Sequence, residues 1–409
     1  MPGVGGQTAR PPGAWKGVQM TAGWGHLFAI TPADLYNKGF LTEIDSKQRG
    51  CMTAQNVTED AVLAALRQVN DPDLQKDIVT LGFVRNMSID GDAVKFDINL
   101  TTPACPVKDQ MRDEAVRLVQ AIPGVGKVDV EMTAEVRASP QMGKGALDKV
   151  RNVVAVGSGK GGVGKSTIAV NIAAALAQSG ARVGLLDGDI YGPSLPIMLG
   201  VSGTPEHNGG KIVPAQSAGL KFMSMGLLVK TPDQPLIWRG PMAHKAFQQC
   251  LFDVEWGELD YLIVDLPPGT GDVHLTLAQS VPMTGAVIVS TPQDVGMQIS
   301  IKTLRMFEQT KVPILGIVEN MSYYICGHCD AKDYIFGDGG ARRAATEMSI
   351  PFLGEVPLDI PIRTQADLGC PIVVSHPEAA SSVALRQIAE QVASQVSIRN
   401  YNAPVLEIE

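Results

Sequence analysis

Two short stretches of this sequence combine residue types and spacings that suit chemistry on phosphates and on metals. The stretch GSGKGGVGKST, residues 157–167, fits the phosphate-binding pattern G-x-x-x-x-G-K-[ST], whose glycines let backbone N–H groups approach phosphate oxygens. Within it, Lys165 brings a positive charge to the β- and γ-phosphates, and Ser166 can bind Mg²⁺. The stretch CGHC, residues 326–329, offers two thiolates, whereas a tetrahedral metal ion or an iron–sulfur cluster normally takes four.

Carboxylates follow two further apolar runs that read as strands. LLDGDIYGPS carries Asp187 and Asp189, and YLIVDLPPGTGD carries Asp265 before a Gly/Pro loop that can change shape when the γ-phosphate leaves. Carboxylates at such positions can orient Mg²⁺-bound waters and the attacking water. The alternative is that each carboxylate only caps a helix, but three of them in phase with a phosphate loop favour a nucleotide site. The residues expected to bind nucleotide from these motifs are Gly159, Gly161, Gly162, Val163, Gly164, Lys165, Ser166, Thr167 and Asp187, whereas Lys160 could be only a solvated loop charge.

The cysteines are few for a long chain without a secretory apolar segment, which favours a reducing compartment. They are Cys51, Cys105, Cys250, Cys326, Cys329 and Cys370. In such a compartment a close pair indicates a metal or redox site rather than a disulfide. A zinc ion or a thioredoxin-like dithiol remains an alternative to a cluster, and His328 is expected to be a spacer rather than a ligand. Cys250 and Cys370 stand in apolar contexts and are expected in the core.

Elements that could position these residues are visible in the second part of the chain, residues 150–400. Unbroken apolar runs such as VVAV, YLIVD and GAVIVST alternate with helical segments. This alternation predicts an α/β fold with a doubly wound, mostly parallel sheet, in which the phosphate loop joins a strand to a helix. The loop after the run PILGIVEN, which carries the CGHC pair, is then expected at the carboxyl edge of that sheet.

The first part of the chain predicts a smaller unit. Residues 52–136 alternate in the order α-β-β-α-β, which indicates a small α+β domain, and residues 137–149 read as a linker. Residues 401–409 are expected to be a tail. Residues 1–51 are rich in Gly and Pro and are expected to be a disordered extension upstream of Met52. A cytoplasmic location follows from that reading, or an organelle matrix if the extension is a transit peptide.

Charge and hydropathy exclude some classes of partner. The formal net charge is -8, which argues against nucleic acid or an anionic membrane as the main partner. No apolar stretch is long enough for a membrane span. We therefore expect neither nucleic acid nor membrane among the partners.

The motifs together resemble the Mrp/ApbC family of iron–sulfur cluster carrier ATPases, within the larger MinD/ParA class. The residues that carry the resemblance are GSGKGGVGKST, LLDGDIYGPS, LIVDLPPGTGD, STPQDV, GIVENMS and CGHC, in the order of the family from about residue 152 to 397. The second lysine of the phosphate loop, Lys160, matches the deviant Walker A pattern of that class. The resemblance implies an ATP-hydrolysing homodimer in which Lys160 reaches the nucleotide of the partner subunit.

The resemblance also implies what the remaining site residues do. Lys160, Lys165, Asp189 and Asp265 are implied as catalytic residues, with Asp189 positioning the attacking water. Asn320 and the region near Pro357 are implied to line the adenine pocket. A two-fold axis would bring Cys326 and Cys329 together with their partner copies, so that four thiolates bridge a [4Fe-4S] cluster. The implied cofactors are ATP, Mg²⁺ and this cluster, and the implied partners are apo iron–sulfur proteins and cluster assembly scaffolds.

The first domain resembles the small iron–sulfur assembly module of SufT-like proteins. The resemblance rests on DPDL, IVTLGFV and TTPACPV, and it places Cys105 where that module carries a reactive cysteine. A position at the start of a helix would lower the pKa of this thiol. The alternative is a small buried residue, as free cysteines often are.

Three functions compete for these features. A cluster carrier with slow ATP hydrolysis uses both the phosphate loop and the cysteine pair. A positioning ATPase of the MinD/ParA type needs a basic membrane-binding or DNA-binding surface, which the C-terminal stretch SQVSIRNYNAPVLEIE does not supply. An electron-transferring ATPase like the nitrogenase iron protein uses well-separated cysteines, so the C-x-x-C spacing disfavours it. A structural zinc at the dimer interface would keep the ATPase and change only the metal.

Overall fold

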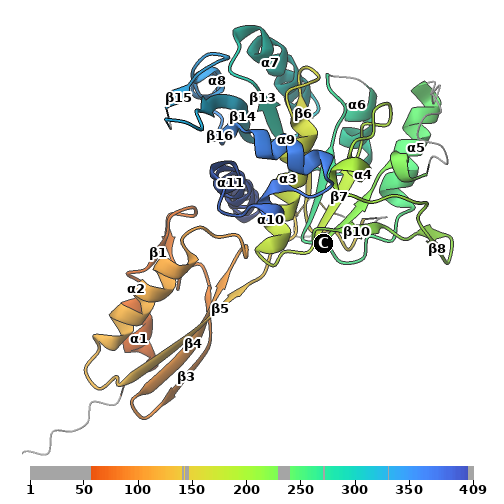
Figure 1. Cartoon of the computed structure of the whole chain (residues 1–409). Helices are drawn as coiled ribbons and strands as arrows, with labels where there is room; N and C mark the ends of the chain where they lie inside the picture. Colours follow the sequence, from red (N-terminus) through yellow and green to blue (C-terminus); the bar gives the residue numbers. More distant parts are fainter. Residues whose placement is uncertain are drawn as a thin grey trace, which may run out of the picture. The chain divides into compact units, whose positions relative to one another are not determined.

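The computed structural model describes residues 57–140, 142, 147–228, 240–269, 272–329 and 331–403, all within the compact unit Ala54–Glu409 (Figure 1). The predicted extension 1–51 lies outside these residues, as does most of the predicted tail. Within the described ranges, no helix combines the length and the apolar character that a membrane span requires.

The first elements form a small sheet with two helices, as the sequence predicted. Strand β3 pairs antiparallel with β4, and β4 pairs parallel with β5, so the three-stranded sheet has the order β3-β4-β5. A short antiparallel pair, β1 with β2, precedes it. The elements are α1 (Glu59–Leu66), β1 (Asn70–Asp71), β2 (Lys76–Asp77), β3 (Val84–Asp90), β4 (Ala93–Leu100), α2 (Lys108–Gln120) and β5 (Lys127–Ala134).

This small sheet has a hydrophobic core of its own. On β4, Val94, Phe96, Ile98 and Leu100 are buried at every second position, as period-two strand geometry requires. They pack with the apolar positions of α1 and α2 in one cluster. Helix α1 begins after Thr58, whose hydroxyl accepts a hydrogen bond from the backbone N–H of Ala61 at 3.3 Å.

The larger sheet has nine strands in the order β10-β11-β7-β12-β6-β13-β14-β15, with β16 paired beside β14. All of its pairs are parallel except β10 with β11 and β14 with β15. The strands are β6 (Val153–Ser158), β7 (Val183–Asp187), β10 (Ala215–Ser217), β11 (Leu220–Met223), β12 (Tyr261–Asp265), β13 (Gly285–Ser290), β14 (Ile314–Ile325), β15 (Lys332–Asp333) and β16 (Phe352–Leu358). The prediction of a doubly wound, mostly parallel sheet is confirmed.

Helices cover both faces of this sheet, and each face has its own buried cluster (Figure 1). One cluster includes residues of α3, α10 and α11, and the other includes residues of α5, α6, α7 and α8. The helical elements are α3 (Lys165–Gln178), α4 (Leu195–Met198), the 3-10 turn η1 (Met225–Leu227), α5 (Gly240–Phe252), α6 (Asp272–Ser280), α7 (Asp294–Gln309), α8 (Gly340–Glu347), α9 (Ile360–Asp367), α10 (Ile372–Ser375) and α11 (Ala380–Asn402). A short pair, β8 (His207–Asn208) with β9 (Lys211–Ile212), completes the described elements.

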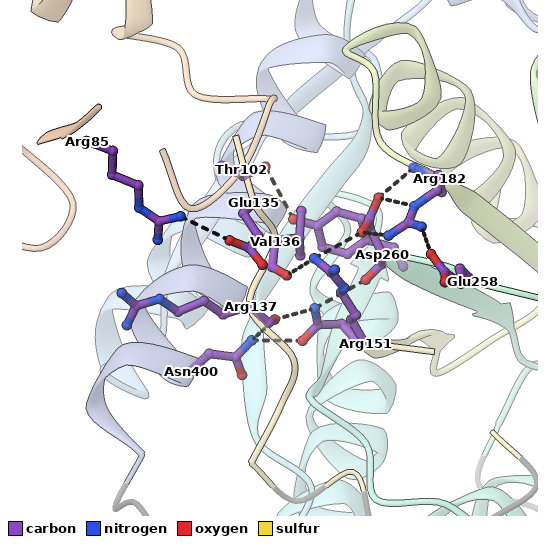
Figure 2. A network of polar contacts seen from close by, with 12 residues as sticks. Arg85, Thr102, Glu135, Val136, Arg137, Arg151, Arg182, Glu258, Asp260 and Asn400 are labelled. Carbon is purple, nitrogen blue, oxygen red and sulfur yellow. Dashed lines mark hydrogen bonds and ion pairs between the residues drawn. The ribbon is translucent and has the colours of Figure 1, made fainter. Parts of the chain in front are cut away.

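Hydrogen bonds join the chain after β4 and the chain after β5 to the starts of strands in the large sheet (Figure 2). The Tyr261 hydroxyl, at the start of β12, donates to the Thr102 hydroxyl at 3.3 Å. Arg151, just before β6, donates to the Val136 carbonyl at 2.6 Å and forms an ion pair with Asp260 at 3.6 Å. The start of the large sheet therefore holds the chain directly after β4 and directly after β5.

A pair of asparagines holds the next residue of that segment (Figure 2). The side-chain amides of Asn152 and Asn400 each donate to the Arg137 carbonyl at 3.0 Å, and Asn400 also donates to the Asn152 side-chain oxygen at 2.8 Å. Residue 137 is where the predicted linker 137–149 begins, so this part of it is anchored to the residue before β6 and to α11. The domain boundaries themselves stay predictions.

Replacing Asp260 tests how much this network contributes to the stability of the fold. Arg182 donates to it from its backbone and from two guanidinium nitrogens at 2.9–3.2 Å. Burial tends to raise the pKa of Asp260, but the hydrogen bonds and charge of Arg182, with that of Arg151, outweigh it and hold the pKa below its usual value. We expect Asp260→Asn to lower the free energy of unfolding by about 2 kcal/mol at pH 7, measured by urea denaturation.

The pH dependence of that difference follows from its sign. Because the pKa is lower in the folded state, the contribution is present above the unfolded pKa, about 3.9, and is lost as the pH falls through the folded pKa. The gap between the wild type and Asp260→Asn should thus shrink below about pH 4. Glu258→Gln is the matched control, since Glu258 pairs with the same Arg182 but is exposed and should cost less than about 0.5 kcal/mol. Equal losses in the two variants would contradict this account.

Candidate functional site

The phosphate loop connects β6 to α3 in the way that the sequence predicted. Gly164, which caps the first turn of α3, has φ +79°, a left-handed conformation that favours glycine. A Cβ atom at this position would lie 2.2 Å from the side-chain nitrogen of Asn320. That nitrogen donates to the Val163 carbonyl at 2.8 Å, so the end of the loop is held against β14. The loop leaves no room for a side chain at Gly164.

Replacing Gly164 therefore tests the geometry of the loop. We expect Gly164→Ala to weaken ADP binding by at least about tenfold, because the methyl group displaces Asn320 and the residue is strained at positive φ. Isothermal titration calorimetry with ADP measures the effect. The control is Gly327→Ala, because a Cβ atom at Gly327 meets open space in the cysteine hairpin. Unchanged affinity in Gly164→Ala would contradict this geometry.

Lys165 and Asp265 form a buried ion pair at the carboxyl edge of the sheet. The Lys165 ammonium lies 2.5 Å from one Asp265 carboxylate oxygen and 3.2 Å from the Ser166 hydroxyl. Burial raises the pKa of Asp265, while the charge of Lys165 and the hydrogen bonds of Lys165 and Ser166 act in the opposite direction. This pairing holds the lysine ammonium, the Ser166 hydroxyl and a carboxylate within reach of one another, as phosphate and Mg²⁺ chemistry needs.

Asp187, at the end of the neighbouring strand β7, is also buried and well ordered by hydrogen bonds. Its carboxylate accepts from the Ser224 hydroxyl at 2.9 Å, from the backbone N–H of Leu195 at 3.3 Å and from that of Asp189 at 3.1 Å. Burial, together with the nearby charge of Asp265, raises the pKa of Asp187 to about 7. Carboxylate and hydroxyl oxygens are the ligands that Mg²⁺ prefers, so the residues here fit that ion.

Lys160 makes a contact that the sequence did not predict. Its ammonium donates to the side-chain oxygen of Gln293 at 2.9 Å, and the Thr291 hydroxyl donates to the same oxygen at 2.8 Å. Gln293 belongs to the stretch STPQDV and precedes helix α7. The two lysines of the loop thus have different partners: Lys165 is paired inside the site, and Lys160 is held at the loop after β13.

A cavity of about 420 Å³ lies beside the phosphate loop. Asn320 and Pro357, which the resemblance assigned to the adenine pocket, both line it together with Thr167. The other lining residues are Gly164, Ser194, Ile197, Met198, Met321, Leu358, Asp359, Ile362, Arg363, Ala366 and Asp367. The structure brings the expected residues to one mostly apolar cavity, a setting that suits a nucleobase; its use by adenine stays a prediction.

The cysteine pair stands on a hairpin that continues strand β14. Residues Tyr324 and Ile325 of β14 pair antiparallel with β15, and the backbone N–H of Cys326 donates to the Ala331 carbonyl at 3.0 Å. Cys329 is exposed. The pKa of Cys326 is lowered because the backbone N–H of His328 and then the side chain and backbone N–H of Cys329 stabilise its thiolate. This lowering of the pKa favours the thiolate of Cys326, the form that binds metal.

The hairpin offers two ligands rather than a complete metal site. In the described part of the chain, no three His, Cys, Asp or Glu side chains gather as a metal would require. The role of His328 as a spacer stays a prediction, and Asp330 lies outside the described residues. Any further ligands have to come from elsewhere.

The comparison with known protein families decides the class of this chain. Residues 149–393 match the ParA family model, described as NUBPL iron-transfer P-loop NTPase, which covers more than half of the 409 residues. The chain belongs to this family. A second model, described as iron-sulfur cluster assembly protein, matches residues 59–131 in the small α+β part of this NUBPL-type P-loop NTPase.

Individual relatives agree with the family match. The "Iron-sulfur cluster carrier protein" of Synechocystis is 51% identical over 349 residues, 84% of this chain and 99% of the relative. The "Iron-sulfur cluster transfer protein NUBPL" of Dictyostelium discoideum is 48% identical over 266 residues, 64% of this chain and 81% of the relative. A solved nucleotide-binding protein of Archaeoglobus fulgidus in complex with ADP is 40% identical, with a TM-score of 0.51 over 59% of this chain and 95% of that one. The resemblance drawn from the motifs is confirmed.

Cys105 does not have the lowered pKa that its position predicted. The thiol is buried against the core of the small sheet, and this burial raises its pKa to about 11, more than the backbone hydrogen bond of Val107 lowers it. Burial outweighs the helix start because an apolar environment penalises the thiolate directly. A role for Cys105 as an accessory thiol in this NUBPL-type NTPase stays a prediction. Cys250 is in the core as predicted, whereas Cys370 is only partly buried, and Cys51 lies outside the described residues.

Three residues that shape the site were not predicted from the sequence. Ser224 orders Asp187, Gln293 holds Lys160, and Glu319 is a fully buried carboxylate on β14, beside Asn320. Gln293 and Glu319 lie inside the quoted motifs STPQDV and GIVENMS, which could have pointed to them. Ser224 follows an ordinary apolar run, and only the pairing of β11 with β7 brings it to Asp187.

Proposed function

We propose that this protein carries an iron–sulfur cluster on Cys326 and Cys329 and uses ATP to control its delivery to apo-proteins. The observation that carries the proposal is the position of the cysteine hairpin on β14. The same strand touches the phosphate loop through Asn320 and ends directly before Cys326. One element therefore serves both the nucleotide site and the metal-binding thiols.

The names of the relatives support an iron–sulfur cluster as the cargo. Family members that share most of this chain are named iron-sulfur cluster carrier or transfer proteins. The second family match, to an iron-sulfur cluster assembly protein, points to the same chemistry. A carrier must bind its cargo and also release it, and ligands on an exposed hairpin suit release better than a buried site does.

The number of ligands supports a symmetric dimer. Two copies related by a two-fold axis supply four thiolates from Cys326 and Cys329, the set that a [4Fe-4S] cluster requires. We propose that the cluster bridges the two copies. A zinc ion held by the same four thiolates is the alternative, and it would give the hairpin a structural role instead.

The residues of the nucleotide site support hydrolysis of ATP. Lys165 would release Asp265 to bind the β- and γ-phosphates, and Ser166 would hold Mg²⁺, which when bound neutralises charge on those phosphates. Asp189, at the edge of the site after β7, would orient the attacking water, with Asp187 fixing its backbone through the 3.1 Å hydrogen bond. Lys160 would leave Gln293 and add a second positive charge at the nucleotide of the partner copy.

Cluster transfer to an acceptor tests this function. The protein is reconstituted anaerobically with iron and sulfide and mixed with an apo-enzyme whose activity depends on a [4Fe-4S] cluster. We expect the acceptor to gain activity, at a rate that changes when ATP and Mg²⁺ are added. Reconstituted protein that holds a cluster and never activates the acceptor would contradict a carrier. Protein that takes up only zinc would point to the structural alternative.

A further inference from the structure

Strand β14 departs from regular pairing between Asn320, which contacts the phosphate loop, and the cysteines. Opposite β16, Asn320 pairs with Val356 and Tyr324 pairs with Leu358, so three residues of β14 face Pro357 alone. The first of the three, Met321, has φ +58°, a left-handed conformation that is uncommon for a residue with a side chain. Such a bulge re-aims the strand beyond it, which here is the strand that leads into Cys326.

A buried carboxylate closes this bulge. Glu319 has no exposed surface, and its carboxylate accepts from the Ser322 hydroxyl at 2.6 Å and from the backbone N–H of Ala341 at 2.7 Å. Ser322 lies inside the bulge and is itself fully buried. Ala341 lies in the first turn of α8, where unpaired N–H groups favour an anion. Glu319 thus fixes the shape of the bulge and docks α8 against it.

The same helix end touches the loop that holds Lys160. A Cβ atom at Gly340, the first residue of α8, would lie 2.3 Å from the Pro292 carbonyl oxygen. Pro292 directly precedes Gln293, the hydrogen-bond partner of Lys160. The first turn of α8 is therefore packed closely against this loop at Gly340 and bonded to Glu319 at Ala341.

The Ser322 hydroxyl has a second acceptor within reach. Its oxygen lies 3.5 Å from a carboxylate oxygen of Glu355 on β16, and Glu355 forms a looser ion pair with Arg342 at 3.8 Å. A hydroxyl donates one proton, so it can satisfy only one of the two carboxylates at a time. In the structure Ser322 is turned to Glu319, and a rotation of its hydroxyl toward Glu355 would give the bulge a second hydrogen-bonded arrangement.

We propose that Glu319 and Ser322 are positioning residues that couple the nucleotide site to the cysteine hairpin. This inference rests on the proposed function and names how ATP would act on the cargo. Movement of Asn320 or of the loop at Gln293 shifts Glu319 or α8, Ser322 exchanges one acceptor for the other, and the direction of β14 at Cys326 changes. Coupling requires such an element with two arrangements that both sites can bias.

Reactivity of the two cysteines in cluster-free protein measures this coupling directly. The alkylation rate of Cys326 and Cys329 by iodoacetamide is followed by mass spectrometry of the full chain, with and without a non-hydrolysable ATP analogue and Mg²⁺. In the wild type we expect the analogue to change this rate by at least about fivefold. In Ser322→Ala the change should fall below about twofold, while the affinity for the analogue stays near that of the wild type.

Two further variants separate coupling from loss of structure. Ser382→Ala removes another fully buried serine hydroxyl, on α11, which donates to the Ile372 carbonyl at 3.0 Å. This variant should keep the wild-type response. Glu319→Gln keeps an acceptor for Ala341 but turns an amide toward Ser322, so it should lose the response as Ser322→Ala does.

A wild-type response in either Ser322→Ala or Glu319→Gln would overturn the proposal, as would a wild type that does not respond to the analogue. Because the assay needs no cluster, its outcome is independent of whether the cargo is a cluster or zinc.

Discussion

Lys160→Ala is expected to lower the rate of ATP hydrolysis by about a thousandfold while leaving nucleotide affinity nearly unchanged. In the structure the Lys160 ammonium donates to Gln293, so removing this side chain leaves the backbone of the phosphate loop and the Lys165–Asp265 pair in place. We expect its charge to act at the nucleotide of the partner copy, where phosphoryl transfer depends on stabilising negative charge. Phosphate release gives the rate, and calorimetry with ADP gives the affinity.

Replacing Lys165, the other lysine of the loop, should have a different effect from replacing Lys160. Lys165→Ala should abolish nucleotide binding and also destabilise the fold by about 3 kcal/mol, because it leaves the Asp265 carboxylate buried without its partner. Lys95→Ala, an exposed lysine on β4, is the control and should change neither quantity. If Lys160→Ala hydrolyses ATP at the wild-type rate, the proposed role of Lys160 across the dimer is wrong.

Single replacement of Cys326 or Cys329 by serine is expected to remove the cluster. Each change deletes two of the four proposed thiolates of the dimer at once, since both copies carry it. Iron and acid-labile sulfide should fall from about four each per dimer to near zero, and the visible absorbance of the reconstituted protein should disappear with them. The hairpin is at the surface, so the melting temperature of the cluster-free protein should hardly change.

Replacing a cysteine outside the site is the control for these variants. Cys370→Ser changes a partly buried cysteine far along the chain, beside α10, and should keep the full iron content. A Cys326→Ser protein that still binds iron and sulfide like the wild type would exclude the hairpin as the cluster site. Retention in Cys329→Ser alone would mean that a ligand other than the C-x-x-C pair completes the site.

The phosphate loop and the sheet that carries it were predictable because their signals are local. Glycines, a lysine and a serine at fixed spacing, between an apolar run and a helical segment, leave few other structures for residues 157–167. Asp187 and Asp265 followed from the same logic, because strand ends of a parallel sheet meet at one edge. The two-sided burial of β6, with every residue inside, explains why its sequence reads as an unbroken apolar run.

Contacts between distant segments were beyond the sequence. Ser224 reaches Asp187 only because β11 lies beside β7, and Gln293 reaches Lys160 only because β13 lies beside β6. The prediction of a lowered pKa for Cys105 was wrong for a different reason. Its position before a helix was predicted correctly, but the burial that raises its pKa depends on how the small core packs around it. The bulge at Met321 likewise arises from pairing with β16, which no local pattern encodes.

The central claim is that two copies of this chain share one [4Fe-4S] cluster through Cys326 and Cys329. Metal and sulfide analysis of the anaerobically reconstituted protein, combined with its mass in solution by light scattering, tests this directly. The account predicts a dimer with about four iron and four sulfide per two chains. One zinc per dimer without sulfide, or a monomer that retains its full cluster, would contradict it.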